Sequence, residues 1–191
     1  MTLISRFTLD GVTDISLGIE LLPEFDAPVL PSTRDKFVEI PGRQGRWEFT
    51  GDLAARQIVL PCAAMSSTRE GLAAVIRTLT TALLDSDGKP KDVALILLDE
   101  PTKTYTVRYA GSMQISRLVG GSVGYFPIPF TAADPYAYGS EDTDTNNITA
   151  AYQEVEIVNA GDYKTPATIT ITNNGVTDVT GFTLICRKLK G

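Results

Sequence analysis

Residues 93–109 read VALILLDEPTKTYTVRY and contain two different β-strand patterns in succession. Val93 to Leu98 is a continuous apolar run, short enough for a strand that is buried on both faces. Lys103 to Tyr109 alternates between polar and apolar residues, with tyrosine and valine on one face. The acidic and proline-containing segment Asp99 to Pro101 separates the two runs. The stretch therefore predicts two consecutive strands in a β-rich protein.

A single helix is predicted on the N-terminal side of this stretch. Ser67-Thr68-Arg69-Glu70 fits the S-x-x-E capping box, in which the Ser67 hydroxyl accepts a hydrogen bond from the amide three residues later. Apolar residues then recur at helical spacing, namely Leu72, Val75, Ile76, Leu79 and Leu83. Because leucine and isoleucine at this spacing usually belong to a core, we expect this stripe to pack on a sheet.

Further short strands are predicted at residues 15–21, 47–50, 57–62, 113–119 and 123–131. Gly120 and Gly121 would form the hairpin turn between the last two. The chain has 16 glycines and 11 prolines without a period, which favours many turns between short strands. Cys62 and Cys186 each lie in an apolar, strand-like segment, so two separately buried thiols are expected. The predicted fold class is mainly β with one flanking helix.

The segment from Pro23 to Gly45 is too long and too apolar for a loop that only connects two elements. One interpretation is an extended arm whose short strands pair outside their own core, with a neighbouring subunit as a possible partner. The other is a long surface loop that folds back on the same domain, and both stay open. The candidate interface residues on the arm are Arg34, Phe37, Val38, Ile40 and Arg43.

The C-terminal quarter of the chain differs from the rest. Residues 140–150 form an acidic, polar run typical of a solvated linker. Segments 152–158, 167–172 and 177–186 are again strand-like, and Asn173-Asn174-Gly175 is a hairpin-turn signal. Residues 151–191 are too few for an ordinary sandwich of ~100 residues, so we expect either a completion of the first domain or part of a second one.

Composition excludes several classes of function. The chain of 191 residues has no histidine, which removes Ser-His-Asp and Cys-His nucleophiles, HExxH metal sites and a histidine general base. A net charge of −6 without a basic run argues against nucleic-acid binding by phosphate neutralisation. The N-terminus lacks a signal-peptide pattern, and no apolar stretch is long enough for a membrane helix. We therefore expect neither an enzyme, a cofactor, a metal site nor a membrane protein.

The order of motifs between Gly42 and Gly139 resembles the N-terminal domain of siphophage distal tail proteins. It begins with Pro41 to Gly45 before an aromatic strand, continues with Arg56 to Cys62 and the helix, and then includes Asp99 to Pro101. It ends with the signature Asp134-Pro135-Tyr136-Ala137-Tyr138, the most specific part of the match. Ala133 stands where the family usually has a small polar residue or cysteine.

The resemblance implies a tail-tube-like β-sandwich or split barrel over residues 1–139, the linker 140–150, and opening strands of an incomplete galectin-like β-sandwich over 151–191. It implies a structural protein of the virion tail, made in the host cytoplasm, that forms a homo-hexameric ring at the baseplate. Its expected partners are itself, the tail-tube protein, the tail-tip or tail-associated protein and a receptor-binding protein. DNA would pass through the channel without specific binding, and an acidic wall would keep the duplex from sticking.

Three alternatives are weighed beside this hypothesis. A tail-tube or tube-terminator subunit would share the fold. A carboxylate-based cell-wall glycosidase would need two carboxylates facing a cleft, with Glu39, Asp99 and Glu100 as possible members. A sugar-binding module would need an aromatic-lined groove.

Overall fold

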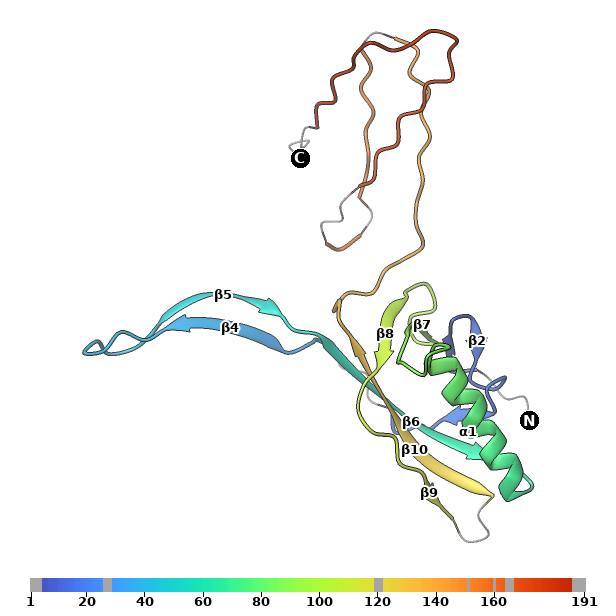
Figure 1. The fold of residues 1–191 in the computed structure, drawn as a ribbon. Helices are drawn as coiled ribbons and strands as arrows, with labels where there is room; N and C mark the ends of the chain where they lie inside the picture. Colours follow the sequence, from blue (N-terminus) through green and yellow to red (C-terminus); the bar gives the residue numbers. More distant parts are fainter. Residues whose placement is uncertain are drawn as a thin grey trace. The chain divides into compact units, whose positions relative to one another are not determined.

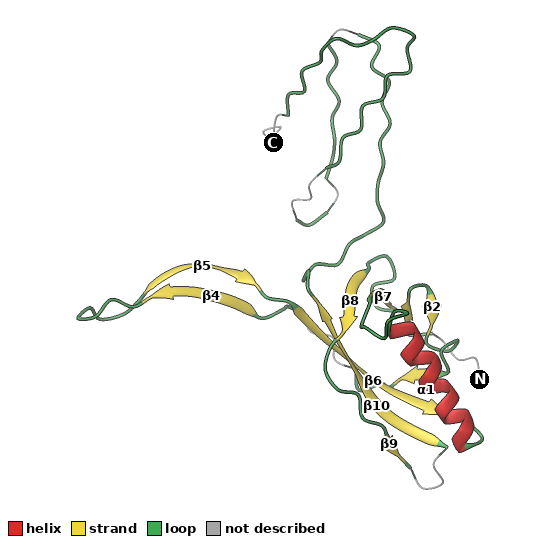
Figure 2. Ribbon diagram, viewed as in Figure 1, coloured by secondary structure: helices red, strands yellow, loops and turns green. Residues whose placement is uncertain are grey.

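The structure is a computed structural model that describes residues 5–25, 29–118, 122–150, 152–159, 161–163 and 167–186. The chain divides into two compact units, Met1–Asp142 and Thr143–Gly191. All helices and strands assigned among the described residues lie in the first unit (Figure 1 and Figure 2). The prediction of a mainly β fold with one flanking helix is confirmed.

One antiparallel sheet forms the body of the first unit. Its strands are β1 (Phe7–Leu9), β2 (Val12–Thr13), β3 (Ile19–Leu21), β6 (Arg56–Met65), β7 (Asp92–Leu97), β8 (Tyr105–Tyr109), β9 (Ser116–Arg117) and β10 (Val123–Ala132). They follow the order β2-β1-β7-β8-β10-β6-β3, and β9 pairs with β10. β6 and β10 pair along their whole length, with Arg56 opposite Ala132 and Met65 opposite Val123.

The N-terminal strands are shorter than the sequence predicts. Residues 15–21 were expected to form one strand, but residues 14–18 form a turn and only Ile19–Leu21 joins the sheet. The turn is organised by the buried carboxylate of Asp14, which accepts hydrogen bonds from the amides of Arg6 and Ile15. The alternation of apolar residues does not show that the Asp14 side chain bonds nearby amides, and such local bonds favour a turn over a strand.

The helix α1 (Arg69–Leu83) lies where the apolar stripe predicts it, but the predicted cap is wrong by one residue. Thr68 is the N-cap, and its hydroxyl accepts from the amide of Gly71 at 3.0 Å. An N-cap side chain accepts a hydrogen bond from the amide two or three residues later, and serine and threonine are both common at this position. The sequence alone therefore does not distinguish Ser67 from Thr68. Glu70 therefore lies in the first turn and does not complete a capping box with Ser67.

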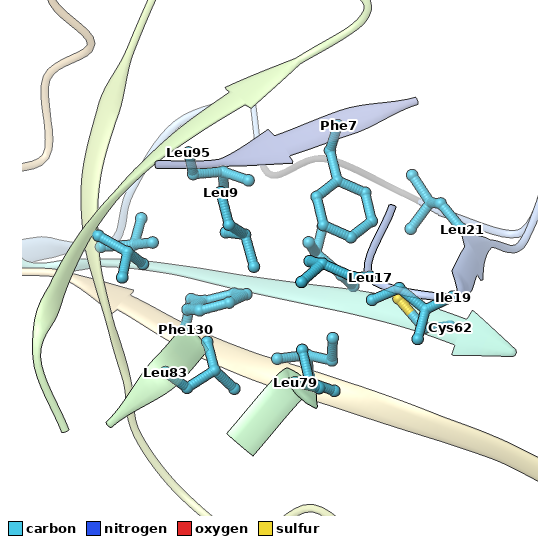
Figure 3. Close-up of a cluster of buried hydrophobic side chains, with 14 of the residues drawn as sticks. Phe7, Leu9, Leu17, Ile19, Leu21, Cys62, Leu79, Leu83, Leu95 and Phe130 are labelled. Atoms are coloured by element: carbon cyan, nitrogen blue, oxygen red, sulfur yellow. The ribbon is translucent and has the colours of Figure 1, made fainter. Parts of the chain in front are cut away.

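The core forms between the inner face of the sheet and α1. Figure 3 shows Phe7, Leu9 and Leu21 from the first strands, Leu79 and Leu83 from α1, and Phe130 from β10 converging on one apolar interior. Leu60, Leu79, Leu95 and Ile128 are fully buried. Packing of this kind is the main source of stability of the unit, because burial of an apolar side chain contributes ~1.5–3 kcal/mol.

Three other predictions need correction. β7 buries Val93, Leu95 and Leu97 on one face only, so it is not a strand buried on both faces. The strand predicted at 113–119 is reduced to Ser116–Arg117, and the expected turn at Gly120-Gly121 lies outside the described residues. Cys62 is buried as predicted, whereas Cys186 is exposed.

The described residues of the second unit form no strand, although three strand-like segments were predicted there. Their apolar side chains are exposed, because no further layer within these residues covers them. The predicted turn chemistry is present: the Asn173 side chain accepts from the amide of Gly175 and donates to the carbonyl oxygen of Thr177. Asn159 makes the same two bonds to Gly161 and Tyr163. Within the described part of the whole chain, no helix has the length and apolarity needed to cross a membrane.

Candidate assembly interface

A β-hairpin outside the body sheet contains residues 33–45 of the predicted segment 23–45. It consists of β4 (Thr33–Val38) and β5 (Trp47–Leu53), which form a separate two-stranded sheet. The amide of Ala54 donates to the carbonyl oxygen of Ser32 at 2.7 Å and closes its root just before β6 begins. The arm thus lies outside the core, but its strand partner is β5 of the same chain. We call residues 33–53 the arm.

The tip of the arm is a proline-glycine turn. The amide of Arg43 donates to the carbonyl oxygen of Ile40 at 3.1 Å, across Pro41 and Gly42. Gly42 has a φ of 84°, which is the backbone that the third residue of a type II turn requires. Proline before glycine is the preferred sequence for such a turn, so the sequence around 41–42 determines where the chain reverses.

Two aromatic side chains of the arm each have an arginine guanidinium stacked on the ring. The guanidinium of Arg43 stacks over Trp47 at 4.4 Å, and that of Arg46 over Phe37 at 4.6 Å. Trp47 and Phe49 are still 54% and 57% exposed. Such contacts contribute ~0.5–1 kcal/mol at exposed sites, too little to replace burial in a core.

The polar residues near the root of the arm pair across its strands. Arg34 lies opposite Asp52, and the Lys36 ammonium forms an ion pair with the Asp52 carboxylate. The hydrogen bond and charge of Lys36 hold the pKa of Asp52 below its usual value. The register shifts between Arg34 and Lys36, next to Gly51. A Cβ at Gly51 would lie 2.9 Å from the Asp35 carboxylate, so a larger residue at this irregularity would displace the exposed Asp35 side chain.

The structure brings all five predicted arm residues onto one hairpin. Arg34, Phe37 and Val38 lie on β4, while Ile40 and Arg43 lie at the tip. Sequence reasoning missed Trp47, which lies opposite Val38, and Phe49, which lies opposite Lys36. The signal was the alternation of residues 47–50, which was attributed to a short strand separate from the arm.

The signature Asp134 to Tyr138 closes the body at the root of the arm. The amide and carbonyl groups of Tyr138 bond those of Thr104 at 2.9 and 2.8 Å. Asp134 accepts from the Tyr136 amide and from the Tyr138 hydroxyl, a bond that raises the pKa of Tyr138. The Arg56 guanidinium donates to the carbonyl oxygen of Pro135 at 3.1 Å. The first residue of β6 and the C-terminal end of the body are therefore held together.

The described residues offer little for chemistry. They include no group of three His, Cys, Asp or Glu side chains that could hold a metal ion. Glu39 lies at the tip of the arm, whereas Glu100 lies beside β8 and accepts from the Tyr105 hydroxyl at 3.1 Å. Burial, followed by this bond, raises the pKa of Tyr105. Of the carboxylates considered for a glycosidase, Glu39 therefore lies on a different element from Asp99 and Glu100, which are neighbours in the turn after β7.

Comparison with known proteins assigns this architecture to a family. The sequence profile of the phage tail protein RIFT-related domain matches residues 14–132, a range that includes the arm, α1 and β10. The chain belongs to this family of phage tail proteins. The matched range ends just before Asp134, so the signature lies outside it.

A solved structure has the same fold. The Dit (gp 19.1) protein of phage SPP1, described as a paradigm of the hub adsorption apparatus in phages that infect Gram-positive bacteria, matches with a TM-score of 0.60 at 23% identity. The match covers 72% of this chain and 53% of the SPP1 protein, so the chain spans about half of that protein's length. The comparison with curated protein sequences gave no match. The resemblance to siphophage distal tail proteins is confirmed at the level of family and fold.

Proposed function

We propose that this phage tail protein is a structural hub of the tail tip, in which copies join through their arms into a hexameric ring. Residues 1–139 form the ring domain, residues 140–150 the linker, and residues 151–191 belong to a galectin-like sandwich. One face of the ring meets the tail tube and the other the tail-tip protein, while receptor-binding proteins attach at the periphery. DNA leaves the virion through the central channel without specific binding.

The observation that supports the ring is the uncovered apolar surface of the arm. Phe37, Val38, Ile40, Trp47 and Phe49 are each between 46% and 57% exposed on one two-stranded hairpin. Val38, Trp47 and Phe49 share one face of the hairpin, whereas Phe37, opposite Glu48, lies on the other. Two-stranded hairpins are marginally stable alone, and exposed apolar side chains on both faces of such a hairpin indicate a protein interface. A contact between the arm of one copy and another part of the next is heterologous, and such contacts close into rings when the rotation permits.

Charge supports passage of DNA. The basic residues Arg34, Lys36, Arg43 and Arg46 balance four acidic residues on the arm, Asp35, Glu39, Glu48 and Asp52. The rest of residues 1–139 has nine basic and twelve acidic residues, so the body carries three of the six net negative charges and the linker 140–150 the other three. A channel lined by such a body would repel phosphates and leave the duplex free to move.

The test is the mass and shape of the full chain at tens of micromolar, by sedimentation and negative-stain electron microscopy. We expect a six-subunit ring with a central hole. Serine at Phe37, Trp47 and Phe49 should convert it to monomers. Serine at three exposed apolar residues of the second unit, Ile157, Val176 and Phe182, should leave the ring intact. A wild-type chain that stays monomeric would overturn the proposal, and long stacked tubes would favour a tail-tube subunit instead.

A further inference from the structure

The outward side chains of β6 and β10 form an uncharged strip on the body. Directly opposite pairs on this face are Met65–Val123, Ala63–Tyr125, Pro61–Pro127, Val59–Pro129 and Gln57–Thr131. We call these ten residues the β6–β10 strip. Met65 is 69% exposed and Val59 is 48% exposed.

The neighbouring part of the same sheet face is polar. Arg108 on β8 lies opposite Thr131 of the strip and forms a bidentate ion pair with Asp92 on β7, at 2.8 and 2.9 Å. Thr106 of β8 is also exposed and lies on the same side of the strand as Arg108. A solvated sheet face normally alternates apolar-inside and polar-outside residues, as β8 does with Thr106 and Arg108 outside. The apolar outer side of β6 and β10 departs from that pattern and indicates a covered surface.

Two prolines interrupt strand pairing at the middle of the strip. Pro61 and Pro127 lie opposite each other and have no amide hydrogen to donate to a neighbouring strand. β9 pairs with β10 at Gly124 and Tyr125, and β8 pairs with it at Phe130 and Thr131, which leaves the segment between them without a strand partner on that side. A hollow of about 220 Å³ opens there, and its lining includes Leu22, Pro61, Ser116, Tyr125 and Pro127.

We infer that Trp47 of one copy's arm inserts into this hollow on the β6–β10 strip of a second copy, an inference that rests on the proposed ring. Trp47 is the single tryptophan of the chain and is half exposed on the arm. Interfaces are dominated by a few aromatic anchors that fill pockets lined by apolar groups. The apolar face of the arm and the strip are matched surfaces on different parts of the same chain, as a head-to-tail contact requires.

Charge complementarity favours a second copy as the occupant. Glu20 on β3 lies opposite Ala63 on the same outer face, is exposed, and forms no ion pair with any described residue. Arg43 stacks on Trp47 and likewise has no ion-pair partner in the described part of the chain. Glu20 lies beside Ala63 of the strip and Arg43 lies beside Trp47, so the two surfaces carry opposite unpaired charges.

The lengths of the two surfaces are also compatible. A strand rises ~3.3 Å per residue, so the ten-residue strands β6 and β10 present a strip ~33 Å long. The seven-residue β5 of the arm spans ~23 Å, which leaves room for the tip. With Trp47 beside Pro61 at the middle of the strip, about 13 Å of strip remains on either side, so the strip holds the tip and the residues next to Trp47 while the root of the arm extends past its end.

The single tryptophan makes the contact directly measurable. We expect the emission maximum of the full-length wild-type chain to shift to shorter wavelength on concentration, over the range in which sedimentation detects assembly. Val59→Glu places a charge in the strip and should raise the concentration for half-assembly by about tenfold or more, because a tenfold change needs only ~1.4 kcal/mol. Its emission should stay at the monomer position. Thr106→Glu, on the polar part of the same face, is the matched control and should change the midpoint by less than about twofold.

A second experiment does not depend on the effect of a buried charge. In a Cys186→Ser background, chains with Val38→Cys are mixed with chains carrying Val59→Cys and oxidised. A disulfide between different chains is expected, whereas Thr106→Cys in place of Val59→Cys should give none. Normal assembly of Val59→Glu with a normal emission shift, or assembly of the wild type without a shift, would overturn the inference and leave the ring standing. A monomeric wild type would overturn both, and circular dichroism of α1 confirms that each variant is folded.

Discussion

Because the arm is separate from the core, replacement of a phenylalanine by alanine should lower the free energy of unfolding strongly in the core and only slightly on the arm. Phe130 on β10 is 1% exposed within the core, whereas Phe49 on the arm is 57% exposed. Truncation of a buried phenylalanine to alanine costs ~3–5 kcal/mol, through lost transfer free energy and the cavity left behind. We therefore expect Phe130→Ala to lower the free energy of unfolding of the first unit by about 4 kcal/mol. Phe49→Ala should lower it by less than about 1 kcal/mol.

The assay is urea denaturation followed by the far-ultraviolet circular dichroism of α1, at a concentration low enough that assembly contributes nothing to stability. In a thermal scan, the expected loss for Phe130→Ala corresponds to a decrease in Tm on the order of 10 °C for a domain of this size. Phe126→Ala, at a residue that is 2% exposed, serves as a second core variant and should behave like Phe130→Ala. An equal loss of stability for Phe49→Ala would show that the arm packs on the body, and would refute the assignment of its aromatic side chains to an interface.

Three further predictions concern the body. Burial, followed by the charge of Asp14, raises the pKa of Cys62 from 9.0 to about 12, so one of the two thiols should resist a thiol reagent until the chain is unfolded. Because the pKa of Cys62 is higher in the folded chain than in the unfolded one, the contribution of this thiol to stability is complete below pH 9. The free energy of unfolding should then fall by ~1.4 kcal/mol per pH unit between pH 9 and about 12. Cys62→Ala should remove this slope in alkaline denaturation. Thr68→Ala should cost ~1 kcal/mol in urea denaturation and Ser67→Ala almost nothing, and the reverse order would restore Ser67 as the cap. Asp134→Ala should lower the alkaline midpoint of Tyr138 seen by ultraviolet absorbance, and an unchanged midpoint would show that their hydrogen bond does not form in solution.

Several elements could be predicted because their signals are local. The stripe of α1 repeats every three to four residues, and the alternation of β8 repeats every two, so each pattern reveals both the element and its buried face. The turn at Asn173-Asn174-Gly175 was identifiable for the same reason, since its conformation depends on the residues that form it. Errors at these elements are limited to details such as the choice between Ser67 and Thr68.

The candidate site could be predicted only in part. Length and composition left an arm and a folded-back loop as alternatives for residues 23–45, and Phe37, Val38 and Ile40 are exposed as an interface requires. Trp47 and Phe49 were missed, because alternation specifies which residues share a face and not which strand lies alongside. The β6–β10 strip was missed for a related reason: Val59, Pro61 and Pro127 become one surface only when two strands more than sixty residues apart pair in register.

The sequence by itself determined that this phage tail protein is β-rich, has one amphipathic helix and lacks every histidine-dependent catalytic arrangement. Composition and short-range periodicity depend only on neighbours along the chain, so they can be evaluated before folding. Only the tertiary structure decided that β5 pairs with β4 in place of the body sheet, and that the outer side of β6 and β10 is free of charge. Strand pairing joins distant residues, and its energy depends on which surfaces remain uncovered once the core is complete.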